Sequence, residues 1–165
     1  MDTLLRFILR LFLVPLGALV AMGAGMLVLV VAHWGALQAL AQAAPDARQE
    51  WFIAFVIAGP VLALLVSMMT LIAFTAATIG VMISEVFAVR SFLFHAANGG
   101  LSAWIGWSLM SDVRAEYRVF TDPTTLVAAG LAGGLAYWLI AGWSAGFWKP
   151  LRPPPAPAPN PATPA

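Results

Sequence analysis

Residues 84–102 have the sequence SEVFAVRSFLFHAANGGLS, and this stretch decides how the rest of the chain is interpreted. It places Glu85, Arg90, His95 and Asn98 in a chain that otherwise consists of residues compatible with lipid. Charged and polar side chains are costly inside a membrane and face the interior of a helix bundle or a partner. We therefore expect this stretch to begin at a membrane boundary and to continue into the third of four membrane-spanning helices.

The composition of the 165-residue chain indicates an integral membrane protein. Hydrophobic residues make up 62% of it and charged residues 9%, whereas soluble domains carry roughly 25% charged residues. A soluble protein with so few charges could not cover its own surface. The net charge is +1, and no basic stripe predicts binding to nucleic acid. The absence of cysteine from the sequence excludes disulfides, Cys-zinc sites and iron–sulfur clusters.

The hydrophobic pattern predicts an all-α bundle over residues 1–149, with four spans at about residues 8–34, 51–79, 85–110 and 124–146. Residues 11–31 contain no polar side chain, and about 20 such residues suffice to cross a bilayer. Because the apolar region of a signal peptide is shorter, about 7–15 residues, we prefer a retained first span to a cleaved signal. The second and third spans are expected to meet in a tight turn near residues 80–84. A short interfacial helix over residues 81–89 is the alternative.

Residues 150–165 have the sequence PLRPPPAPAPNPATPA, in which half of the residues are proline. This composition predicts a disordered tail rich in polyproline II conformation. An inert tail is the simpler interpretation, and a docking role is the alternative.

Four polar residues of the third predicted span share one helix face. At 100° per residue, Ser91, His95, Asn98 and Ser102 fall within about 60° of one another. Interhelical hydrogen bonds that fix the packing explain such a stripe most simply. A proton relay, a ligand pocket or a partner contact is the alternative. Glu85 and Arg90 fall outside the stripe and are expected at the membrane interface, where each pairs with a neighbouring helix or a lipid headgroup.

Small residues recur every fourth position and predict close helix packing. The residues concerned are Gly17, Ala21, Gly25, Gly130, Gly134, Gly142 and Gly146.

No catalytic residue, metal site or cofactor is predicted. The sequence contains no nucleophile–base pair and no glycine-rich phosphate loop outside the spans. His33 and His95 are predicted at depths that differ by about 25 Å, so they cannot bind one haem within a monomer. A His95–His95 pair across a parallel dimer remains an alternative.

Lys and Arg residues favour one orientation of the four spans. Five of them flank the termini and the link between the second and third spans, and three lie in the other two loops. Because positive residues accumulate on the cytoplasmic side, both termini are expected in the cytoplasm.

Residues 84–100, SEVFAVRSFLFHAANGG, together with the ending YWLIAGWSAGFW at residues 137–148, resemble uncharacterised four-span inner-membrane proteins of proteobacteria. The resemblance covers a small part of the chain. It implies a bacterial inner membrane and a small helical bundle, and it brings no known activity and no catalytic residue.

These observations predict a non-enzymatic accessory or structural subunit that packs in a larger membrane complex or a homo-oligomer. The chain has too little soluble mass for an enzyme domain. The alternative is an oligomeric channel or transporter element in which His95 and Asn98 line a polar path. A quinone or haem module is a third hypothesis.

Overall fold

The structure is a computed structural model that describes residues 2–109 and 122–146. The described residues are helical, in agreement with the predicted all-α class. The elements in chain order are α1 (Asp2–Ala32), α2 (Trp34–Gln42), α3 (Pro45–Phe87), α4 (Phe92–Leu109), α6 (Pro123–Ile140) and the 3₁₀ turn η1 (Gly142–Ser144). The predicted tail, residues 150–165, lies outside the described residues.

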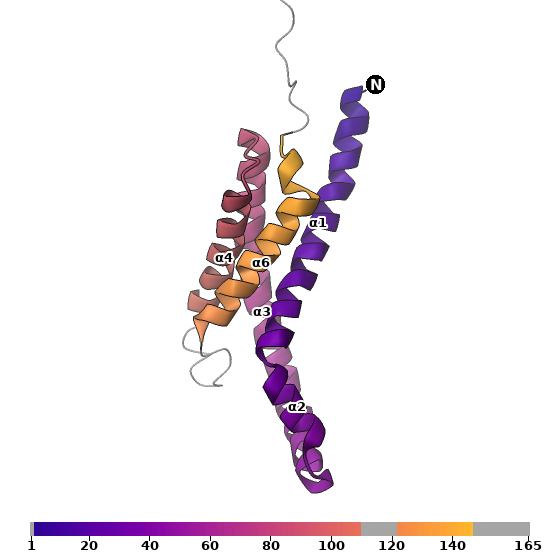
Figure 1. Ribbon diagram of the computed structural model, residues 1–165, viewed down its shortest axis with the longest axis vertical. Coiled ribbons are helices and arrows are strands. Elements are labelled where there is room, and N and C mark those ends of the chain that lie inside the picture. Colours follow the sequence, from indigo (N-terminus) through magenta and orange to yellow (C-terminus); the bar gives the residue numbers. More distant parts are fainter. Residues whose placement is uncertain (1, 110–121, 147–165) are drawn as a thin grey trace, which may run out of the picture.

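Helix α6 lies between α1 and α4, and α4 also packs against α3 (Figure 1). The face of α6 toward α1 consists of positions four residues apart, which line up on one side of a helix. A Cβ at Gly133 would lie 3.0 Å from the carbonyl oxygen of Ala21, and one at Gly25 would lie 3.3 Å from that of Ala129. Gly17 likewise fits beside Tyr137 and Ala141. The small residues predicted on the first helix therefore lie against α6.

The opposite face of α6 approaches α4 backbone to backbone. A Cβ at Gly130 would collide with the backbone of Gly99, and one at Gly134 would collide with the carbonyl of His95. On the far side of α4, a Cβ at Gly106 would lie 3.0 Å from the carbonyl oxygen of Met69 in α3. Glycine at these positions lets the helices approach more closely than any side chain would allow.

The predicted turn near residues 80–84 is wrong, because α3 continues without interruption to Phe87. One glycine in a helix costs only about 1 kcal/mol, and the missing side chain of Gly80 makes room for Asn98. The helix ends instead at Ala88, which has a left-handed φ of 55°. Helix α4 begins at Phe92, so Glu85 belongs to α3, and the predicted third span starts about seven residues later than expected.

The last predicted span is also shorter than expected. Helix α6 ends at Ile140, and the chain continues through the 3₁₀ turn η1 to Gly146, which has a φ of +69°. The carbonyl of Ala141 accepts hydrogen bonds from Arg10 and from the Ser144 backbone N–H, so it does not continue an α-helical ladder. Gly142 and Gly146 therefore do not extend the small-residue face of Gly130 and Gly134. Gly142 lies against the ring of His95, and Gly146 lies against Ala88.

Among the described residues, three helices are long and apolar enough to cross a membrane, at Ile8–Ala32, Pro45–Phe87 and Pro123–Ile140. The protein is therefore a membrane protein with a helical bundle. Helix α4 is not one of these three, because His95, Asn98 and its serines reduce its hydropathy.

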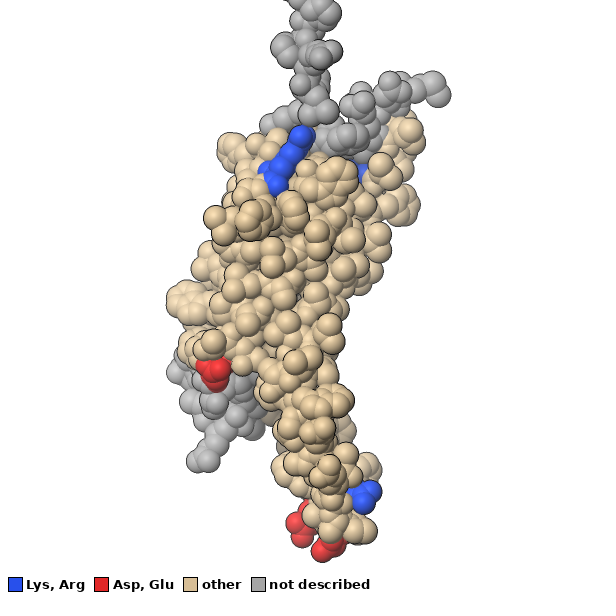
Figure 2. Space-filling model, viewed as in Figure 1, with Lys and Arg blue, Asp and Glu red and all other residues tan. Residues whose placement is uncertain are grey.

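The helices differ in length by more than a factor of two. At 1.5 Å per residue, the 43 residues of α3 extend about 64 Å, and the 18 residues of α4 and of α6 extend about 27 Å. As a result, α2 and the first half of α3 project beyond the ends of α4 and α6 (Figure 1). We name residues 34–66 the α2–α3 hairpin. Figure 2 shows charged side chains near the ends of the molecule and at the tip of this hairpin, with uncharged surface between them.

Candidate functional site

A partly buried ion pair joins two helices that are far apart in the sequence. Arg10 of α1 pairs through Nη2 with Oε1 of Glu85 near the end of α3, and their side chains are only 12% and 20% exposed. Nη1 of Arg10 also donates to the Ala141 carbonyl oxygen at 2.7 Å and to the Ser144 hydroxyl at 2.8 Å. The second carboxylate oxygen of Glu85 accepts from the Gly146 backbone N–H at 3.1 Å. The pair therefore fixes the chain just after α6 to both α1 and α3.

The position of Arg10 follows from the electrostatics of helix ends. The last carbonyls of a helix have no intrahelical partner, and they form its partial negative pole. A guanidinium group can bind several oxygens at once because its donors lie in one plane. Arg10 uses this geometry at the C-terminal end of α6. Arg90 also binds the chain that follows α6, since its Nε donates to the Ala145 carbonyl oxygen at 2.9 Å.

His95 lies beside this ion pair and is 1% exposed. Its Nε2 lies 3.3 Å from the carbonyl oxygen of Val89. Because a carbonyl only accepts hydrogen bonds, Nε2 must carry the proton in this contact. The imidazole ring also packs against the Tyr137 ring of α6, with 5.4 Å between the ring centroids. We name Arg10, Glu85, His95 and Tyr137 the Arg10 cluster, and the end of the bundle that contains it the Arg10 end.

The remaining residues of the predicted polar stripe do not join this cluster. Asn98 turns to α3 and donates through Nδ2 to the Ala77 carbonyl oxygen at 3.0 Å. The hydroxyl of Ser102 is buried and donates to the carbonyl oxygen of Asn98 at 2.6 Å. Ser91 is exposed and lies before α4 begins. The structure thus places His95 against α6 and Asn98 against α3, and leaves Ser91 outside the bundle interior.

The two predicted interfacial charges lie at the Arg10 end but differ in burial. Glu85 pairs with a neighbouring helix, which is one of the two partners expected for it. Arg90 is exposed, and its carbonyl oxygen accepts from Trp138 Nε1 at 2.8 Å. The Trp138 ring makes an edge contact with Phe92, with 6.0 Å between the centroids. These contacts connect the link before α4 to the end of α6.

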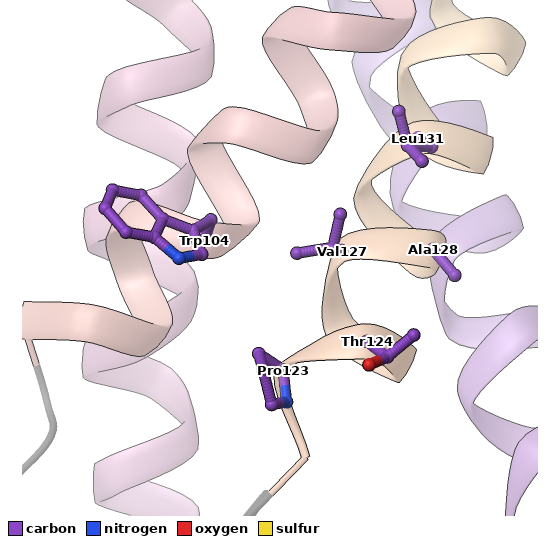
Figure 3. Close-up of a pocket in the computed structure, with 6 residues that line it drawn as sticks. All are labelled: Trp104, Pro123, Thr124, Val127, Ala128 and Leu131. Atoms are coloured by element: carbon purple, nitrogen blue, oxygen red, sulfur yellow. The ribbon is translucent and has the colours of Figure 1, made fainter.

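An apolar groove of about 380 Å³ lies at the opposite end, between α4 and α6 (Figure 3). Six residues line it: Trp104, Pro123, Thr124, Val127, Ala128 and Leu131. Apart from the Thr124 hydroxyl and the Trp104 indole N–H, its side chains offer only carbon atoms. Asp122, the N-cap of α6, lies next to it in the chain and accepts from the Thr124 backbone N–H at 3.0 Å.

Within residues 2–109 and 122–146, no group of three His, Cys, Asp or Glu side chains could hold a metal ion. His33 is exposed and lies between α1 and α2, and its Nδ1 lies 2.9 Å from the Leu29 carbonyl oxygen in the last turn of α1. It lies at the other end of α1 from Arg10 and does not approach the Arg10 cluster.

Comparison of the chain with protein-family models, with curated proteins and with solved structures finds no match. The geometry of the described residues is therefore the basis for assigning the site.

Sequence reasoning did not identify Arg10 and Tyr137 as members of the site. Arg10 is 131 residues away from Ala141, and no local pattern connects the two positions. Tyr137 offered a weak signal, because a tyrosine hydroxyl within an apolar span needs a polar partner or an interface.

Proposed function

We propose that this protein is a non-enzymatic accessory or structural subunit of a larger complex in a bacterial inner membrane. In this proposal α4 is the fourth span, since its 18 residues extend about 27 Å and the hydrocarbon core is about 30 Å thick. Helix α4 lies between α3 and α6, so its polar residues face protein rather than lipid. The proposed orientation has both termini in the cytoplasm, which the distribution of Lys and Arg supports.

The observation that carries the proposal is the apolar surface of the α2–α3 hairpin. Gly106, in the last turn of α4, packs beside Met69 of α3. The α3 segment from residue 45 to residue 66 therefore extends about 33 Å past the end of α4. Large apolar side chains of this segment are exposed: Trp51 63%, Phe52 67%, Phe55 71%, Val56 56% and Ile57 73%.

A bilayer around the bundle cannot cover the whole hairpin. The exposed N-cap Asp122 marks one end of α6, and a charged residue lies at or outside the membrane boundary. The hairpin continues beyond that level (Figure 1). Because a contiguous apolar surface in water marks an interaction site, we infer that a partner subunit covers it.

The contacts of the stripe residues favour a packing role over transport. Asn98 donates to the Ala77 carbonyl oxygen of α3, and such a bond holds neighbouring helices together. Ser102 donates to the Asn98 carbonyl oxygen of its own helix, so its hydroxyl is satisfied locally. The described bundle therefore offers no row of free polar groups along α4.

Co-purification of the full chain in a mild detergent, followed by mass spectrometry, tests this role. We expect a stoichiometric partner with the wild type. Phe55→Gln should reduce its recovery at least tenfold because the residue lies on the hairpin. Phe87→Gln is the matched control, since Phe87 is 72% exposed on the same helix but lies at the Arg10 end. A wild-type chain that purifies as a lone monomer would contradict the proposal.

A transporter element is the second candidate, and the burial of His95 next to an ion pair favours it. Flux of protons or small ions into proteoliposomes is the measurement. Flux that disappears in His95→Ala and Asn98→Leu would support transport, and flux that survives both substitutions would exclude it.

A further inference from the structure

Three buried polar atoms of the Arg10 cluster have no hydrogen-bond partner among the described residues. They are Nε of Arg10, Nδ1 of His95 and the hydroxyl oxygen of Tyr137. His95 is 1% exposed and Tyr137 is 6% exposed, so bulk water does not reach either ring. Buried polar groups in proteins are almost always hydrogen-bonded to protein atoms or to ordered water. Three such atoms in one cluster therefore indicate a binding site for a small polar molecule.

The three atoms lie on side chains that approach one another from three helices. The His95 and Tyr137 rings are in contact, with 5.4 Å between their centroids. Arg10 donates to the Ala141 carbonyl oxygen at 2.7 Å, and a Cβ on the next residue, Gly142, would lie 2.8 Å from His95 Nε2. Tyr137 also packs on Gly17, which lies two helical turns after Arg10 on α1.

The chemistry of these atoms matches a water molecule. Nε2 of His95 carries the proton in the contact with Val89, so Nδ1 has a free lone pair and accepts. Nε of Arg10 donates, and the Tyr137 hydroxyl can do either. Water offers two donors and two acceptors, and buried waters typically make about three hydrogen bonds. An anion fits less well, because Glu85 already neutralises Arg10 and would repel it.

We propose that the Arg10 cluster encloses an internal water site, in which water bridges His95 Nδ1 and the Tyr137 hydroxyl and accepts from Arg10 Nε. The charged and titratable groups around it are Arg10 from α1, Glu85 from α3 and Tyr137 from α6. The site gives the buried imidazole a polar contact that the helix packing does not supply. This inference is independent of the proposed subunit role, because a packing subunit and a transporter could each contain it.

Solid-state NMR of the full chain in lipid bilayers tests the site directly. With ¹⁵N-labelled histidine there are two residues to assign, and His33→Gln identifies the signal of His95. Water-edited spectra report magnetisation transfer from mobile or bound water to each ring nitrogen. We expect transfer to His95 Nδ1 and a chemical shift typical of a hydrogen-bonded, unprotonated ring nitrogen.

Tyr137→Phe removes one water partner without removing the ring, and it should reduce the transfer to His95 Nδ1 at least twofold. The exposed His33 in the same spectra is the internal reference, and Tyr117→Phe alters the other tyrosine of the chain as a control. Absence of transfer to His95 in the wild type would overturn the proposal, whether or not the variant folds. Unchanged transfer in Tyr137→Phe would also overturn it.

Discussion

Arg10 and Glu85 are separated by 75 residues in the chain, yet they form the ion pair around which the Arg10 end is built. Charges with so little exposure are stable only when each is paired and when the remaining donors and acceptors are used. Here the additional bonds go to Ala141, Ser144 and Gly146. The pair therefore does more than neutralise charge, since it closes the end of α6.

Removal of one partner should be costly. Glu85→Gln leaves the Arg10 guanidinium without its counter-charge, and we expect it to lower the free energy of unfolding by about 3 kcal/mol. Unfolding by SDS in bicelles, followed by tryptophan fluorescence, is the measurement. The control is the double variant Arg10→Met/Glu85→Met, which leaves no unpaired charge and should be more stable than Glu85→Gln. A double variant that is less stable would contradict this account.

At the other end of the bundle, we expect Asp122 to make the stability of the protein dependent on pH. The Thr124 backbone N–H, together with the Thr125 hydroxyl, lowers the pKa of this carboxyl below its ordinary value of 3.8. A group with a lowered pKa stabilises the fold above its unfolded-state pKa. That contribution is lost as the pH falls through the folded-state pKa.

Asp122→Asn should remove this pH dependence while keeping the helix cap, because asparagine is also a good N-cap. We expect the difference in unfolding free energy between wild type and variant to be constant above about pH 5 and to fall in magnitude or change sign below about pH 4. Unfolding curves from pH 2 to pH 7 in bicelles measure it. Parallel curves at every pH would exclude this role for Asp122.

At the scale of the elements, α6 is constrained on two sides, since it contacts α1 and α4 through two different faces. One face presents Gly133 to the backbone of Ala21, and the other presents Gly134 to the backbone of His95. A backbone atom cannot move aside as a flexible side chain can. The two faces therefore fix the spacing of three helices.

Gly134→Ala tests this close approach. The new methyl group would collide with the His95 carbonyl, and overpacking of this kind typically costs 1–3 kcal/mol, so we expect a loss of about 2 kcal/mol in the free energy of unfolding. Gly23→Ala is the matched control, because no atom lies within 4 Å of the added Cβ. It should be neutral or slightly stabilising, since alanine favours a helix over glycine. If the two substitutions changed the free energy of unfolding equally, helix propensity and not packing would account for the change.

At the scale of the whole molecule, α3 is much longer than α4 and α6. The tip of the α2–α3 hairpin therefore lies far from the Arg10 end of the bundle. The exposed Ser91 lies at the Arg10 end, and the exposed Gln49 lies near the start of α3, close to the tip of the hairpin. The proposed orientation puts these two positions on opposite sides of the membrane.

The natural absence of cysteine makes this orientation easy to measure. We expect Gln49→Cys to react with a membrane-impermeant maleimide in intact spheroplasts, and Ser91→Cys to react only after permeabilisation. The opposite pattern would reverse the orientation, and labelling of both in intact cells would exclude α3 as a membrane span.

The sequence by itself determined the membrane environment and the helical class, because both depend on composition and on the length of apolar runs. It also identified the small residues of α1 and the pair Gly130 and Gly134, since their spacing is local. Tertiary structure alone showed that α3 runs through Gly80 to Phe87, with Asn98 packed where a side chain at Gly80 would lie. It likewise decided that Glu85 pairs with Arg10 and that α6 stops at Ile140. The last two outcomes involve contacts between residues 75 and 131 positions apart, and no local pattern in the chain contains such contacts.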